Sequence, residues 1–105
     1  MPNYMLAYHG GKKPETKEET DKVMAAWGAW MEANKSALVD PGNPVGMSKT
    51  VSSAGVADNG GPNPLAGYTI ISSDNLDAAC EIASANPIVA DGGSVEVAEI
   101  VVIEM

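Results

Sequence analysis

The feature that most constrains the fold is residues 63–97, where the sequence pattern changes from strand to helix and back to strand. Residues 67–72 form a compact run rich in β-branched residues, which predicts a strand. Small and apolar residues recur at helical spacing over 76–83, and Asn86-Pro87 ends that helix. Val95 and Val97 open another strand after a Gly-Gly turn. The stretch therefore predicts a βαβ-type unit.

The helix of this unit begins after a polar group of residues. Ser73 or Asp74 is expected to cap it, with the negative charge of Asp77 in its first turn. Leu76, Ala79, Cys80 and Ala83 recur at helical spacing as one narrow apolar stripe, so we expect Cys80 to be a small buried hydrophobe. It is the only cysteine, which excludes an intramolecular disulfide.

The N-terminal half repeats the order of strand and helix. Residues 3–9 alternate as a strand, with Tyr4, Leu6 and Tyr8 on one face and Met5, Ala7 and His9 on the other. A helix is predicted within 14–38, capped near Thr16, because five residues share a helical face typical of packing on a sheet: Val23, Trp27, Trp30, Met31 and Asn34.

The middle of the chain is richer in turn residues. Residues 40–44 predict a turn, 45–51 a second strand, and 57–64 a long polar loop that is either mobile or a lid. The apolar end, 100–105, is out of phase with Val95 and Val97, which indicates a bulge or break near residues 98–99. It predicts an edge strand that pairs with a second chain.

The element order is thus β-α-β-β-α-β in one domain, residues 1–105. This order predicts an α+β, ferredoxin-like fold with an antiparallel sheet and two helices on one face. The other sheet face is also apolar and needs a cover. We therefore expect a homodimer, formed through the sheet face and the C-terminal strand as a dimeric α+β barrel.

The charge of the chain excludes several classes of binding partner. The net charge is −8, and residues 50–105 hold eight acidic residues and no basic one. The chain has no arginine, so a bidentate clamp for phosphate or carboxylate is absent. Neither nucleic acid nor a membrane is expected as a partner. With no signal peptide or apolar span visible, the expected location is cytoplasmic.

Three segments together resemble the YCII-related (DGPF-type) family: YMLAYHGG, GYTIISSDNLDAACEIA and NPIVADGGSVEV. The resemblance covers essentially the whole chain. It implies a dimeric α+β barrel, related in fold to muconolactone isomerases and to small heme- or quinone-handling barrels. Some relatives act on chlorinated aromatic breakdown products, while most members have no assigned activity.

The chain departs from the family pattern at the site. Members of the family carry a His–Asp pair, but Ala25 and Asn34 stand at those positions here. The DGPF segment is replaced by residues 58–62, Asp-Asn-Gly-Gly-Pro. The family pair is therefore not carried over to this sequence.

His9 is the only histidine and the candidate catalytic base. The strand order places it near residues 64–68 and 91–96, so Asp91 or Glu96 is the expected carboxylate partner. A strand at 45–51 would leave Asp40 and Asn43 at the opposite end of the sheet, out of reach of His9. The alternative is a surface histidine with local hydrogen bonds.

Tyr8 or Tyr68 could donate to a developing enolate oxygen, and Ser94 is a further ligand-binding candidate. One histidine and scattered carboxylates offer no metal-ligand spacing, so we expect neither a metal nor a cofactor.

Two functions remain open. The first is an isomerase, lyase or dehalogenase-like enzyme acting on a cyclic or aromatic acid, with His9 as general base. The second is a non-catalytic barrel that binds a small ligand or regulates. A buried His9 with a carboxylate partner favours the enzyme, and a fully solvated His9 favours the binder.

Overall fold

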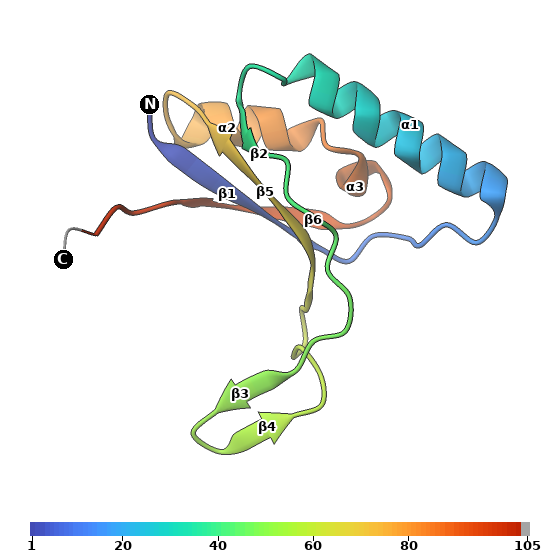
Figure 1. Ribbon diagram of the computed structural model, residues 1–105, viewed down its shortest axis with the longest axis vertical. Helices are drawn as coiled ribbons and strands as arrows, with labels where there is room; N and C mark the ends of the chain where they lie inside the picture. The colour runs from blue at the N-terminus through green and yellow to red at the C-terminus, as the bar shows by residue number, and fades with distance from the viewer. Residues whose placement is uncertain (104–105) are drawn as a thin grey trace.

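Strand β1 (Asn3–His9) is at the centre of the fold. The computed structural model, described for residues 1–103, pairs β1 with β5 (Leu65–Ser72) on one side and β6 (Ser94–Glu99) on the other. β2 (Leu38–Asp40) lies on the outer edge of β5, giving the order β2-β5-β1-β6 with all neighbours antiparallel (Figure 1). This is the predicted ferredoxin-like arrangement.

The helices α1 (Lys17–Ala33), α2 (Leu76–Ser84) and α3 (Pro87–Ala90) lie on one face of the sheet (Figure 1). The Thr16 hydroxyl caps α1 as predicted, accepting from the Glu19 amide at 3.0 Å. The sequence did not predict α3. Asn86-Pro87 does end α2, but proline also suits the first position of a new helix, and Asn86 caps it.

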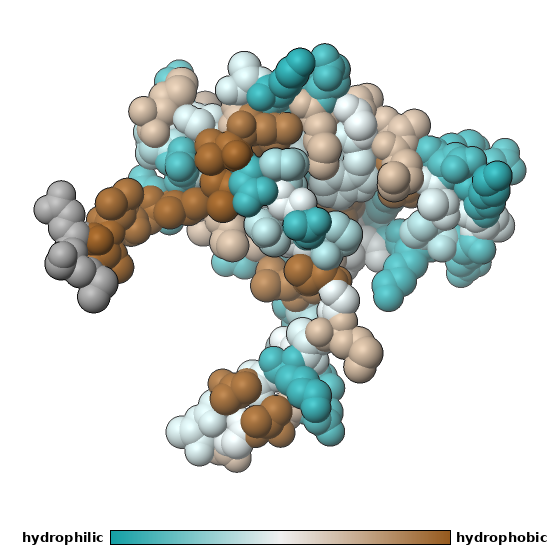
Figure 2. All heavy atoms as spheres, viewed as in Figure 1, coloured by the Kyte–Doolittle hydropathy of each residue, from teal (hydrophilic) through white to brown (hydrophobic). Residues whose placement is uncertain are grey.

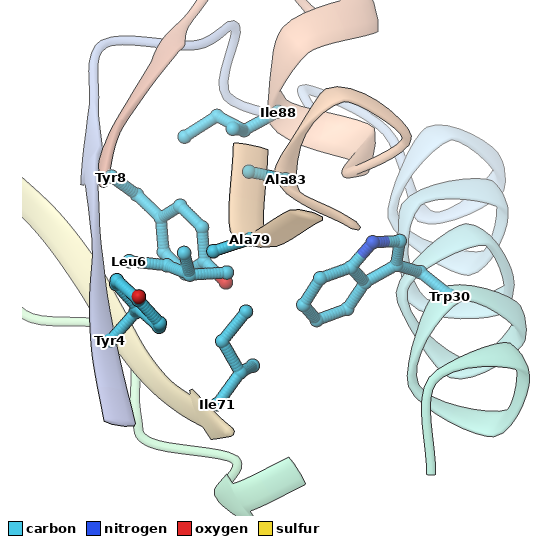
Figure 3. Packing of buried hydrophobic residues seen from close by; sticks show 8 residues of the cluster. All are labelled: Tyr4, Leu6, Tyr8, Trp30, Ile71, Ala79, Ala83 and Ile88. Atoms are coloured by element: carbon cyan, nitrogen blue, oxygen red, sulfur yellow. The ribbon is translucent and has the colours of Figure 1, made fainter. Parts of the chain in front are cut away.

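The core lies between this sheet face and the helices. The predicted alternation in β1 is confirmed, since Tyr4, Leu6 and Tyr8 are all buried there. They pack with five further buried side chains, drawn in Figure 3: Trp30, Ile71, Ala79, Ala83 and Ile88. The Trp30 indole donates to the Ile82 carbonyl of α2 at 3.1 Å, which holds α1 against α2.

The predicted second strand at 45–51 is wrong, because the strand comes before the turn. The Asp40 carboxylate accepts from the Gly42 amide, and Gly42 takes a positive φ of 72° to turn the chain after β2. Residues 43–45 then follow β5 outward, and the Val45 amide donates to the Ala66 carbonyl. Beyond them β3 (Thr50–Ser52) and β4 (Gly55–Ala57) form a separate hairpin, which stands away from the body (Figure 1).

Two expectations for α2 also need correction. Asn75 caps the helix rather than Ser73 or Asp74, and its side chain accepts from the Ala78 amide at 2.8 Å. The helix turns Ala79 inward, so Cys80 points about 100° away and is exposed rather than buried.

The predicted break near residues 98–99 is confirmed, since β6 ends at Glu99. The Ile100 amide still donates to the Asn3 carbonyl, but residues 101–103 form no strand and expose their apolar side chains (Figure 2). The remainder of the predicted strand, 104–105, lies outside the described residues. Within residues 1–103, no helix combines the length and apolar character that a membrane crossing requires.

Candidate functional site

His9 is the last residue of β1 and lies on the sheet face opposite the helices. A register shift between Tyr8 and His9 places His9 opposite Leu65 at the start of β5. The segment that leads into β5 covers the imidazole, and the residue is only 7% exposed. His9 is therefore a buried side chain on an otherwise open sheet face.

The backbone fixes one side of the ring. His9 Nδ1 lies 3.0 Å from the Asn63 carbonyl oxygen and 3.2 Å from the Pro64 carbonyl oxygen. Because a carbonyl oxygen only accepts, Nδ1 must carry the proton in these hydrogen bonds. The neutral ring is thus held as the Nδ1–H tautomer, with the lone pair on Nε2.

The other side of the ring faces a carboxylate. His9 Nε2 lies 3.2 Å from Glu96 Oε1, and the Glu96 side chain is 69% exposed. Glu96 lies directly opposite Ala7 in the β1–β6 pair, and Ala7 precedes His9 by two residues on the same face. The His9–Glu96 contact is therefore a diagonal cross-strand pair. Because a carboxylate only accepts, Nε2 donates to Glu96 when the ring is protonated on both nitrogens, and Glu96 then stabilises the imidazolium. This geometry suits proton transfer at the open face.

Two further predicted residues lie on this face. Ser94 is directly opposite His9 across the β1–β6 pair, and Tyr68 is opposite Ala7 across the β1–β5 pair. Directly opposed residues project from the same side of a sheet. The structure therefore brings His9, Glu96, Tyr68 and Ser94 to one face.

Tyr8 lies on the opposite face. Its hydroxyl donates to Thr69 Oγ1 at 2.7 Å and accepts from Asn86 Nδ2 at 3.2 Å, within the core. Burial raises the pKa of the Tyr8 phenol, although its hydrogen bonds with Thr69 and Asn86 oppose that shift. The structure gives Tyr8 a place in the core and separates it from the His9 face.

The carboxylate partner is Glu96 and not Asp91. Asp91 lies in the turn after α3, accepts from the Lys12 amide through its carbonyl, and lines a shallow hollow of about 550 Å³ between α1 and α3. Five of the eleven residues that line this hollow are alanines, and it lies on the helix side of the molecule, on the opposite face of the sheet from His9.

Because β2 comes earlier in the chain than expected, Asp40 lies opposite Ile70, and Asn43 lies nearer the His9 end of the sheet than predicted. The Asn43 carbonyl accepts from the Tyr68 amide, so this segment runs towards the His9 end of the sheet. Asp40 nevertheless uses its side chain for the Gly42 turn. The hydrogen bonds of the His9 ring go to Asn63, Pro64 and Glu96 instead.

Sequence reasoning missed the carbonyls of Asn63 and Pro64, which orient the imidazole. Backbone groups carry no residue signature. The only signal was the polar Gly/Pro run at 57–64, which was recognised as a lid or a mobile loop. Within residues 1–103, no three His, Cys, Asp or Glu side chains lie close enough together to hold a metal ion.

Comparison with known proteins agrees with this architecture. A search of curated proteins and a search of solved structures each find no match to the chain. The profile of the YCII-related domain matches residues 3–104, nearly the whole chain. With its four-stranded antiparallel sheet and helices on one face, the protein belongs to the YCII-related domain family.

Proposed function

We propose that this protein is a small-molecule enzyme in which His9 is the general base and Glu96 its carboxylate partner. The observation that carries the proposal is the buried imidazole of His9, which has hydrogen-bond acceptors at both ring nitrogens. A histidine with only a structural role needs no carboxylate on the open side. A buried histidine beside a carboxylate is a typical candidate for an acid–base group in a catalytic site.

The two ring nitrogens have different roles in this proposal. The carbonyls of Asn63 and Pro64 keep the proton on Nδ1, so Nε2 is free to take a proton from a substrate carbon. The exposed Glu96 carboxylate can move aside for the substrate and then stabilise the imidazolium. The electrons of the broken C–H bond pass to a carbonyl oxygen, which the Tyr68 or Ser94 hydroxyl can stabilise.

The surroundings favour a flat and partly apolar substrate. Met5, Ala7 and Ile70 share the open face with His9. The absence of arginine makes tight binding of a phosphate group unfavourable. We therefore propose a cyclic or aromatic acid, and a reaction of the isomerase, lyase or dehalogenase-like type.

The proposal includes a homodimer in the cytoplasm, formed through the open sheet face and the C-terminal segment. It is supported by the apolar residues of the open face and by the exposed side chains of Val101, Val102 and Ile103. Two sheets packed face to face would enclose His9 in a barrel.

A non-catalytic ligand-binding barrel is the second candidate. It is favoured by the apolar open face and the lack of an arginine to hold a substrate carboxylate. In that case His9 would bind the ligand as a hydrogen-bond partner and no turnover would occur.

A thermal-shift screen of cyclic acids, lactones, phenols and quinones tests the proposal, run across pH 5–8 on the native protein, His9→Ala and Glu96→Gln. Glu99→Gln is a matched control, because it removes another carboxylate from the same strand. We expect a ligand that stabilises the native protein and the control but not the other two variants, followed by turnover of its class. Binding without turnover would select the second candidate, and ligands indifferent to His9 would refute both.

A further inference from the structure

The hairpin β3–β4 and its two legs, residues 45–64, form an arm whose tip, the hairpin, stands away from the body of the chain (Figure 1). Val51 and Val56 are directly opposed in the hairpin and share one face, 76% and 62% exposed. A two-stranded hairpin alone in water is marginally stable. An apolar face at its tip therefore requires a surface on which to pack.

The exposed area indicates what that surface is. The chain exposes 7332 Å², whereas a compact folded chain of this mass exposes about 5,500 Å². The radius of gyration is 15.1 Å, against about 13 Å for a compact domain of this length. The excess of roughly 1,800 Å² per chain is the amount that a subunit of an obligate homodimer buries. A second copy of the chain is thus a partner of sufficient size.

Contacts within the chain join the two legs of the arm. Thr50 Oγ1 donates to the Asn59 carbonyl at 2.8 Å, and Lys49 Nζ lies 3.4 Å from Asp58 Oδ1. The two legs also approach each other at Gly60, where an added Cβ would meet Ser48 Oγ of the opposite leg and Pro64 Cβ of its own leg. A chain of contacts therefore runs from the hairpin along the leg to Pro64.

Pro64 and its neighbour Asn63 are the residues whose carbonyls hold His9 Nδ1. Residues 58–64 thus run directly from the hairpin to the carbonyls that contact the His9 imidazole. We propose that the tip of the arm packs on a second copy of the chain, and that this contact fixes the position of the 63–64 carbonyls and so completes the His9 site. A dimer would share its interface between two such arms, related by twofold symmetry.

The proposal deepens the proposed function, because it states how the same site is assembled and regulated. Its test does not use activity, so it can fail while the enzyme proposal stands, and the reverse. The double variant Val51→Glu, Val56→Glu places two charges in the apolar contact. Met24→Glu is the matched control, since Met24 is also an exposed apolar residue, 69% exposed, but lies on α1.

Sedimentation equilibrium and the ¹⁵N signals of the single histidine are measured on all three proteins. We expect the native chain and Met24→Glu to be dimers with the same imidazole signals. The double variant should raise the dimer dissociation constant by on the order of 100-fold and shift the His9 signals. A monomeric native chain, an unaffected dimer, or a lost dimer with unchanged His9 signals would each overturn the proposal.

A second measurement does not depend on the fold of the double variant. In a Cys80→Ser background, Val56→Cys carries a photo-crosslinker, and equal amounts of ¹⁴N- and ¹⁵N-labelled chains are mixed and irradiated. Crosslinked peptides of mixed isotope composition support an interchain contact. Crosslinks confined to one isotope, or none, contradict it.

Discussion

Tyr8 and His9 are consecutive residues on opposite faces of β1. Their side chains differ in how fully the chain covers them and supplies their hydrogen-bond partners. The Tyr8 hydroxyl lies in a closed set of hydrogen bonds with Thr69 and Asn86, beneath three helices. His9 has a backbone cover on one side and the exposed carboxylate of Glu96 on the other. The Tyr8 face is thus covered within a single chain, whereas the His9 face is open to a ligand or a second chain.

The difference follows from the elements that each face receives. α1, α2 and α3 all pack on the Tyr8 side, and the side chains there interdigitate as a core (Figure 3). Within residues 1–103, the His9 side receives the leg of the arm at residues 63–64 and no helix (Figure 1). We therefore expect substitutions on the Tyr8 side to change stability, and substitutions on the His9 side to change binding and chemistry.

The largest expected effect is from Leu6→Ala, which removes a fully buried side chain on the closed face. It should lower the free energy of unfolding by about 2–5 kcal/mol. Met5→Ala, the neighbouring position on the open face, should cost about 1 kcal/mol or less. Urea denaturation at one protein concentration measures both. Equal losses would remove the distinction between the two faces.

Tyr8→Phe should cost about 1–3 kcal/mol, because the Asn86 amide loses a buried acceptor. Tyr68→Phe is the matched control on the open face and should change stability by less than about 0.5 kcal/mol. The same denaturation measurement applies. A Tyr8→Phe protein as stable as the native one would show that the buried hydroxyl contributes nothing.

Alkaline pH tests the same tyrosine differently. Burial raises the pKa of Tyr8 in the folded state above its value in the unfolded chain, about 10. The neutral phenol therefore stabilises the fold below that pH, and this stability is lost as the pH rises through the higher folded pKa.

Tyr8→Phe should then lose less stability than the native protein above about pH 10. Some alkaline loss should remain, since burial also raises the pKa of Tyr4. Unfolding curves measured at a series of alkaline pH values give this comparison. Parallel curves for the two proteins would contradict the assigned shift.

The smallest effect on stability is expected from Glu96→Gln. The Glu96 side chain is 69% exposed, so its contact with His9 should contribute less than about 1 kcal/mol and the fold should hardly change. Binding or turnover of the ligand found by screening should nevertheless fall strongly, whereas Glu99→Gln should leave it intact. A loss shared by both variants would point to general charge rather than to the His9 contact.

The sequence allowed the closed face to be predicted far better than the open one. Alternation in β1 and the cap at Thr16 are local patterns, and both were correct. The second strand was misplaced because the apolar residues at 45–51 belong to an arm with no cover in its own chain. Of the alternating residues Val45, Met47 and Val51, only Val51 lies in a strand, and it pairs within the hairpin rather than with the main sheet.

The sequence allowed side-chain members of the site to be predicted, but not its backbone groups. The strand order placed His9 near residues 64–68 and 91–96, and the strand register then brings His9, Glu96, Tyr68 and Ser94 to one face. Tyr8 was a candidate ligand-binding residue beside His9, but consecutive strand residues project to opposite faces, and Tyr8 therefore lies in the core. Backbone carbonyls from residues 63–64 could not be found, because any residue type can supply them.

The central claim is that the backbone holds His9 as the Nδ1–H tautomer and leaves Nε2 to Glu96 and a substrate. Since His9 is the only histidine, a long-range ¹H–¹⁵N spectrum of the native protein reports it without assignment. Recorded at a pH where the ring is neutral, it should show a protonated Nδ1 and an unprotonated Nε2. A neutral ring with the proton on Nε2 would contradict the account.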